Sequence, residues 1–142
     1  MIQKQQCEML LDTLLPYIEV MLKKEGKFYP VGAVITTDLE KSITALETDE
    51  KHPKSLEVID ELIIMHQELA NDNEIIASGI AYSTGIIDPN RQFSTAIIVS
   101  LEHVDNYSVM VGLPYKVGLF RKVKFGEIFA QKGNQNIFKN PL

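Results

Sequence analysis

The chain has 142 residues, of which 45% are hydrophobic and 23% are charged, and its formal net charge at pH 7 is −5. This length suits one domain with a substantial core, and this composition excludes a disordered, low-complexity or repeat protein. The acidic total and the few arginines, Arg91 and Arg121, argue against a nucleic-acid-binding protein, which needs a concentrated basic face. We therefore expect a single domain over residues 1–142 and no nucleic-acid partner.

The chain lacks the apolar segments that direct proteins into or across membranes. Its first residues contain no uninterrupted apolar stretch of the signal-peptide kind, and no run approaches the roughly 20 residues of a membrane span. The single cysteine, Cys7, cannot form an internal disulfide, which agrees with a reducing compartment. We expect a cytoplasmic location and no membrane partner.

Charge is distributed unevenly along the chain. Residues 38–74 contain eleven acidic residues and three lysines, whereas residues 116–139 contain six basic residues and Glu127 as their acid. The plain interpretation of the basic end is a solvated strand face. The alternative is a docking surface for an acidic partner.

Residues 2–25 are predicted to form an amphipathic helix, because apolar residues recur at steps of three and four. Pro16 should kink or break this helix, since it removes a donor and crowds the carbonyl of Asp12. Gly26 is a suitable C-terminal stop. The apolar stripe comprises Cys7, Leu10, Leu11, Leu14, Leu15, Ile18, Met21 and Leu22.

A hairpin and a second helix are expected next. A strand begins after Pro30, and a turn at residues 38–41 returns the chain into a second strand over 42–48. Residues 49–52 are predicted to be a polar linker. The second helix should start near Pro53 and end near Asn71. His66 lies on its apolar stripe and is interpreted as a packed histidine rather than a ligand.

The strongest pattern covers residues 93–115, where two apolar strands flank a short polar turn. A two-residue loop would put the valines of the second strand on the wrong face. A three-residue loop over 104–106 instead pairs Leu101 with Val109 and Val99 with Val111, and it gives Asn106 the left-handed position. The odd-numbered side chains are then predicted to face the core.

Further strands are predicted at residues 75–87, softened by Gly79 and Gly85, and at 119–130 with a bulge at Gly126. Residues 133–142 are expected to form a loosely ordered tail. The order α-β-β-α-β-β-β-β predicts an α+β domain, with a mainly antiparallel sheet of about six strands and both helices packed on one face. The other face would be partly wet and open to a partner.

The sequence contains no strong signature of a catalytic, cofactor or metal site. The three histidines share no ligand spacing, Cys7 has no companion, and no Gly-rich loop joins a strand to a helix, so we expect no catalytic residue, no cofactor and no metal. Glu102 and His103 are neighbours on a strand and point to opposite faces, so His103 is interpreted as a structural pair with Tyr107. Candidate interaction or pocket residues are Tyr29, Tyr82, Glu102, His103, Tyr115 and Glu127.

Four blocks of the sequence resemble a widespread family of small, uncharacterised bacterial proteins. They are FYPVGAV, TAIIVSLEH, VGLPY and KFGEIFA, in this order. Family members carry an acidic residue and an arginine after the tyrosine that corresponds to Tyr82, whereas this chain has Ser83 and Thr84. The resemblance brings no activity or cofactor. It implies only that Tyr29, Pro30, Glu102, His103, Pro114, Tyr115, Gly126 and Glu127 belong to shared motifs.

Three hypotheses of function follow. The leading one is a non-catalytic protein-interaction module of the bacterial cytoplasm, of the immunity or adaptor type, because site chemistry is lacking and charge is lopsided. The alternative is a small enzyme or small-molecule binder that uses Glu102, His103, Tyr115 or Glu127 at one end of the sheet. The third is self-association through a free sheet edge.

Overall fold

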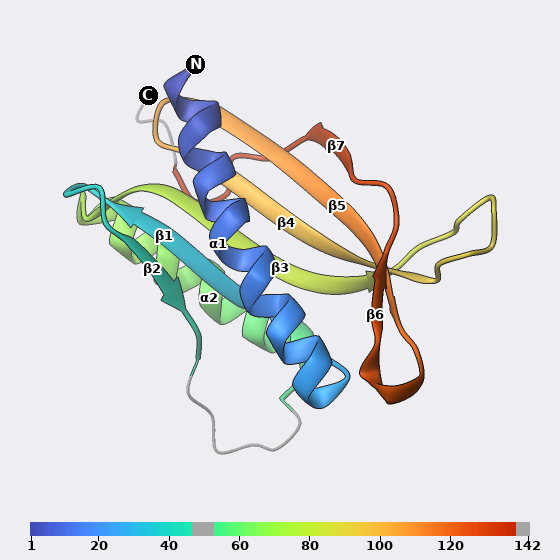
Figure 1. The fold of residues 1–142 in the computed structure, drawn as a ribbon. Helices are drawn as coiled ribbons and strands as arrows, with labels where there is room; N and C mark the ends of the chain where they lie inside the picture. Colours follow the sequence, from blue (N-terminus) through green and yellow to red (C-terminus); the bar gives the residue numbers. More distant parts are fainter. Residues whose placement is uncertain (47–52, 139–142) are drawn as a thin grey trace.

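The structure is a computed structural model that describes residues 1–46 and 53–138, and it forms one α+β domain around a curled sheet (Figure 1). This class and the predicted order of elements are confirmed. The predicted linker at 49–52, the end of the strand predicted over 42–48 and the last four residues of the predicted tail lie outside the described residues. The elements are α1 (Ile2–Glu25), β1 (Val31–Thr36), β2 (Lys41–Thr44), α2 (Ser55–Asn71), β3 (Ile75–Gly85), β4 (Thr95–His103), β5 (Tyr107–Val117), the 3-10 turn η1 (Leu119–Arg121), β6 (Val123–Phe125) and β7 (Phe129–Lys132).

The seven strands form one sheet in the order β2-β1-β3-β4-β5-β6, and β7 pairs with β5 beside β6. Each of these pairings is antiparallel. The single strand predicted over 119–130 is therefore two short strands. They are separated at Gly126, whose backbone N–H still donates to the carbonyl of Pro114 at 2.8 Å.

The hairpin of β4 and β5 has the predicted register. Leu101 lies opposite Val109, Val99 lies opposite Val111, and Asn106 in the connecting turn has a φ of 62°. A two-residue loop would have shifted the pairing and exchanged the two faces of β5. The alternation of large apolar residues is thus sufficient to determine this part of the sheet.

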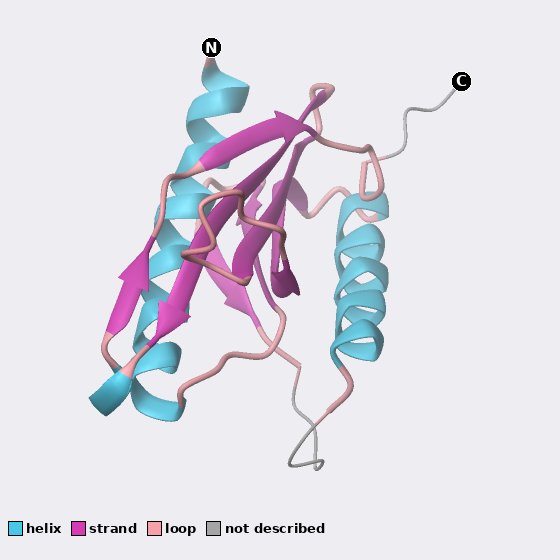
Figure 2. Ribbon diagram, turned by 90° about the vertical axis from the view of Figure 1, so that its right-hand side faces the viewer, coloured by secondary structure: helices cyan, strands magenta, loops and turns pink. Residues whose placement is uncertain are grey.

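The prediction that both helices pack on one face is wrong. Figure 2 shows the sheet between them, with α1 on one side, here called the first face, and α2 on the other, the second face. The physical reason lies in β1, where five consecutive residues from Val31 are buried, so that side chains of both parities need a cover. One helix cannot cover both faces of a strand.

Two separate clusters of buried apolar residues result. The first-face cluster joins α1 to the odd-numbered residues of the central strands, and the second-face cluster joins α2 to Val34, Ile75, Ile80 and the C-terminal segment. Buried members of the first are Cys7, Leu10, Leu14, Ile18, Leu22, Phe28, Val31, Ala33, Ile35, Ala77, Ala81, Ile97, Val99, Leu101, Val111 and Tyr115; those of the second are Val34, Val58, Leu62, Ile75, Ile80, Ile137 and Phe138.

Helix α1 continues through Pro16, so the expected break is absent from this described helix. Both Pro16 and Asp12 are exposed, and the carbonyl that loses its intrahelical donor can therefore bind water. Buried residues on both sides of the proline, from Leu10 to Leu22, anchor the helix to the sheet. Packing of the apolar stripe outweighs the local cost of the proline.

The expectation of a loose tail does not apply to residues 136–138. Ile137 and Phe138 are 4% and 7% exposed and belong to the second-face cluster. Their backbone is held by a side chain of β4, which is described below.

Candidate functional site

The six candidate residues are distributed over both faces of the sheet and its ends. Tyr82 and Glu102 line a groove on the second face. His103 and Tyr115 are buried, whereas Glu127 is exposed and lines a hollow beside the loop at 86–93. The structure therefore does not bring these residues together into one pocket.

Glu102 is 2% exposed, and its carboxylate holds the C-terminal segment. Its Oε1 accepts a hydrogen bond from the backbone N–H of Asn136 at 2.5 Å, and its Oε2 accepts from Ile137 at 2.7 Å and from Phe138 at 3.2 Å. Three amide donors compensate a buried carboxylate for much of its lost hydration. This carboxylate acts as a structural clamp, and its oxygens are already engaged.

His103 is 3% exposed and lies opposite Tyr107, as predicted. Its Nδ1 accepts the backbone N–H of Asp105 at 3.1 Å, so Nε2 carries the proton and donates to Oε1 of Gln6 at 2.5 Å. Burial lowers the pKa of His103, and the nearby Asp105 carboxylate opposes this effect. The ring is a neutral link between α1 and the turn after β4.

His66 is the packed histidine expected from the apolar stripe of α2, and it is fully buried. Its Nδ1 lies 2.6 Å from Oγ of Ser78, and its Nε2 lies 2.8 Å from Oγ1 of Thr44. Burial lowers the pKa of His66 from 6.5 to about 4, so the ring is neutral near pH 7. The ring packs so closely on β1 that a Cβ at Gly32 would overlap it.

Tyr115 is a core residue of the first face. Its hydroxyl lies 2.6 Å from Oγ of Ser83, and its ring centroid lies 6.3 Å from that of Phe28. The aromatic residue therefore packs at the end of the cluster beneath α1. Glu127 lines a hollow beside the loop at 86–93, and Tyr115 is not part of its lining.

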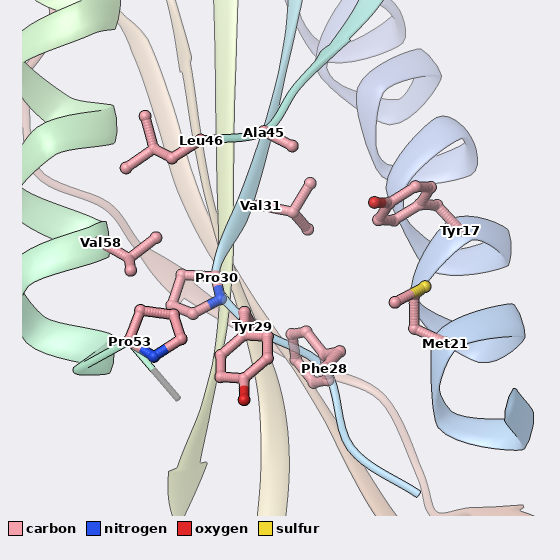
Figure 3. A pocket seen from close by; sticks show the side chains of 10 residues that line it. All are labelled: Tyr17, Met21, Phe28, Tyr29, Pro30, Val31, Ala45, Leu46, Pro53 and Val58. Atoms are coloured by element: carbon pink, nitrogen blue, oxygen red, sulfur yellow. The ribbon is translucent and has the colours of Figure 1, made fainter. Parts of the chain in front are cut away.

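The hollow around Tyr29 is formed by α1, the start of β1 and the start of α2 (Figure 3). It has a volume of about 180 Å³, and Tyr17 and Met21 face it from α1. Leu46 and Pro53, on its other side, border residues 47–52, which the structure does not describe. No site is assigned to this hollow for that reason.

A concavity of the second face, here called the second-face groove, has a volume of about 330 Å³. Helix α2 packs on β3 and β1, and the groove is lined by this helix, by β3, β4 and β5, and by residues of the C-terminal segment. Its floor and walls combine aliphatic, thioether and small polar side chains. The lining residues are Leu56, Ile59, Ile63, Ser78, Ile80, Tyr82, Ser100, Glu102, Met110, Asn134, Asn136 and Ile137.

Of the residues that line this groove, Tyr82 and Glu102 were named as candidates from the sequence, but Ser100, Met110 and the C-terminal wall were missed. The alternation of β4 and β5 could have placed Ser100 and Met110 together, because they are register partners. No local pattern indicates that residues 134–137 return to this face.

Within residues 1–46 and 53–138, no cluster of three or more histidine, cysteine, aspartate or glutamate residues is arranged to hold a metal ion. In the same part of the chain, no helix has the length and apolar character that crossing a membrane requires. Comparison with protein-family models, with curated proteins and with solved structures gave no match.

Proposed function

We propose that this protein is a non-catalytic protein-interaction module of the bacterial cytoplasm, of the immunity or adaptor type, and that the second-face groove receives its partner. The observation that carries the proposal is the incomplete cover of the second face. Helix α2 packs on β3 and β1, and the surface beside it, over β3, β4 and β5, forms an open groove with Tyr82, Ser100 and Met110 exposed in part.

The composition of the groove suits a protein segment. Tyrosine and methionine are enriched in protein interfaces, and an unbranched thioether adapts its shape to a partner's side chain. Leu56, at the mouth of the groove, is 76% exposed, although it is a large aliphatic residue. An apolar side chain of a partner would shield it from water.

Charge indicates the character of the partner. Helix α2 carries Glu57, Asp60, Glu61 and Glu68 and no lysine or arginine. A basic rim around the partner's apolar anchor would complement this helix and accelerate association. We therefore propose a partner with an apolar anchor and flanking lysines or arginines.

The polar residues that an enzyme would use are engaged in structure. Glu102 accepts three backbone donors, His66 bonds to two hydroxyls, and His103 links α1 to a turn. This arrangement supports an interaction role over the small-enzyme alternative, which requires these groups to converge on a substrate.

The test compares two arginine substitutions. Ser100→Arg places a long cation in the groove, and Gln5→Arg places the same side chain on the exposed surface of α1. The partner should be captured from a lysate of the source organism by the wild type and by Gln5→Arg, identified by mass spectrometry, and titrated as purified protein. We expect at least roughly tenfold weaker binding for Ser100→Arg, about 1.4 kcal/mol. Equal binding by the two variants, or no saturable partner, contradicts the proposal.

Self-association through a sheet edge is the second candidate, favoured by β7. Among the described residues β7 pairs only with β5, so its outer edge presents unpaired backbone groups, and its residues are exposed. Light scattering over a range of concentrations tests it. A dimer mass that Ala130→Pro abolishes supports edge pairing, and a monomer throughout contradicts it.

A further inference from the structure

The turn between β5 and β6 exposes two large apolar side chains, Leu119 and Phe120, here called the apolar tip. Leu119 is 86% exposed and Phe120 is 101% exposed, so neither side chain is covered by the domain. The turn projects beyond the sheet, next to the C-terminal end of α1 (Figure 1). Single exposed apolar residues are common on protein surfaces, but two adjacent ones at the end of a projecting hairpin are a candidate contact.

The backbone of this turn is fixed in an unfavourable conformation. Phe120 has φ 57° and ψ 28°, and Arg121 has a φ of 54°. The left-handed region is unfavourable for bulky residues, and here no burial of Phe120 offsets it. Hydrogen bonds hold the turn, since Gly118 N–H donates to the Lys122 carbonyl at 2.8 Å and Arg121 N–H donates to the Gly118 carbonyl at 3.1 Å. Retained backbone strain of this kind clusters at functional sites.

A group of cations, here called the basic collar, lies next to the apolar tip, and its three lysines line one hollow together with Leu119 and Phe120. Lys116 and Lys124 are register partners on the two strands, and Lys116 extends over the ring of Phe93. Arg121 points toward the first face, where its guanidinium donates to the carbonyl of Lys24 at the end of α1. The basic collar consists of Lys116, Arg121, Lys122 and Lys124.

The end of α1, next to this turn, adds no net charge. Its last turn carries Lys23 and Lys24, and the acids of its last two turns are Glu19, which pairs with Lys23 at 3.1 Å, and Glu25. The positive charge beside the apolar tip therefore comes from the hairpin itself, although the whole chain is acidic.

We propose that the apolar tip and the basic collar form a peripheral docking site for an anionic lipid surface. The two apolar side chains lie at the end of the hairpin, and the cations lie behind them. When the tip enters a bilayer, the apolar side chains reach the acyl chains and the cations stay at the level of the anionic headgroups. A convex tip of two side chains enters a soft surface without a complementary pocket, which a protein partner would have to supply. This inference is independent of the second-face groove. The sequence argument against a membrane partner rested on the lack of a spanning segment, and a peripheral contact requires none.

Tryptophan fluorescence tests insertion directly, because the chain contains no tryptophan. Phe120→Trp places a single probe at the tip, and Ile87→Trp places the same probe at a residue that is 98% exposed in another loop. With vesicles of phosphatidylcholine mixed with phosphatidylserine, we expect a blue shift of emission for Phe120→Trp and none for Ile87→Trp. An unshifted Phe120→Trp spectrum overturns the proposal.

Vesicle flotation with tryptophan-free variants separates the two parts of the site. Removing both apolar side chains in Leu119→Ser/Phe120→Ser should weaken binding roughly tenfold or more. Lys122→Gln/Lys124→Gln should weaken it by about fivefold per charge, and added salt should weaken the wild type likewise. The matched controls, Ile87→Ser and Lys4→Gln/Lys54→Gln, should bind as the wild type does.

Two results would overturn the lipid assignment. Equal binding to vesicles of phosphatidylcholine alone would show that anionic headgroups are not recognised. No binding to either vesicle, together with capture of a purified acidic protein that Leu119→Ser/Phe120→Ser abolishes, would assign the apolar tip to a protein partner. Circular dichroism and thermal unfolding of each variant establish that the fold is intact.

Discussion

The Oε2 atom of Glu102 accepts a hydrogen bond from the backbone N–H of Ile137, 35 residues later in the chain, at 2.7 Å. Through this contact and its two neighbours, a buried side chain of β4 draws the C-terminal segment onto the second face. The segment completes the second-face cluster and forms one wall of the second-face groove. One carboxylate thus supports both the fold and the proposed binding surface.

Replacing Glu102 with alanine should lower the free energy of unfolding by about 3 kcal/mol, because three amide donors lose a charged acceptor. Urea denaturation measures this loss. The C-terminal segment should also become sensitive to carboxypeptidase under native conditions. The control Glu127→Ala, at an exposed residue, should change stability by less than about 0.5 kcal/mol. Similar stability losses in the two variants would contradict the clamp role.

The free energy of unfolding should decrease as the pH falls from 6.5 toward 4, because His66 is buried as a neutral ring. Burial lowers its folded-state pKa from 6.5 to about 4, so the native state binds this proton less readily than the unfolded chain does. The contribution of the neutral ring is therefore complete above pH 6.5 and is lost as the pH falls toward 4. Linkage sets its size at about 3 kcal/mol, as an upper value.

The difference in unfolding free energy between the wild type and His66→Gln isolates this contribution from that of the carboxylates. It should be largest near pH 7 and should shrink by pH 4. A pH-independent difference would contradict the assignment. Titration of the imidazole by NMR gives the native pKa independently.

Gly112 should not tolerate a side chain, because the ring of Phe129 on the neighbouring strand occupies the position that its Cβ would take. Gly112→Ala should destabilise the protein by about 1–2 kcal/mol, through displacement of this ring. Gly85→Ala is the matched control, since the nearest atom to its Cβ would be 3.8 Å away. In a double-mutant cycle, Phe129→Ala should remove most of the penalty at Gly112. Simple additivity would mean that the clash lies elsewhere.

Cys7 should react slowly with thiol reagents in the native state. Burial, and to a lesser degree the charges of Glu102 and Glu8, raise the pKa of its thiol from 9.0 to about 12. At pH 8 the thiolate fraction falls roughly a thousandfold relative to an ordinary cysteine, and only the thiolate reacts. The variant Ser94→Cys supplies an exposed thiol in the same chain. A chromogenic disulfide should therefore show one fast and one slow thiol, and two fast thiols would contradict the burial of Cys7.

The sequence predicts the central hairpin in detail and misplaces one helix. Leu101 and Val109 could be paired because an error of one residue would turn a whole apolar stripe toward water. Strand β1 shows a different pattern. Val31, Ala33 and Ile35 point to one face of the sheet, and the apolar Val34 points to the other. Apolar residues of both parities indicate a strand covered on both faces, which places one helix on each side.

The candidate site was less predictable, because it depends on contacts between distant parts of the chain. Glu102 was considered a candidate site residue because its neighbour is His103, although adjacent residues on a strand point to opposite faces of the sheet. Its true partners are backbone amides of residues 136–138, and an amide donor leaves no signature in sequence. The apolar tip was missed for a different reason, since Leu119 and Phe120 were placed at the start of a strand predicted over 119–130, whereas the structure has a turn there.

The burial of β1 on both faces also predicts which backbone amides exchange slowly with solvent. Its amides are shielded by α1, α2 and a strand on either side, whereas β7 is exposed along its length and has one neighbour among the described strands. In deuterated solvent the amides of β1 and β3 should exchange only through global opening, and those of β6 and β7 through local fraying. The sheet edge that carries the turn between β5 and β6 would then be more mobile than the centre of the sheet.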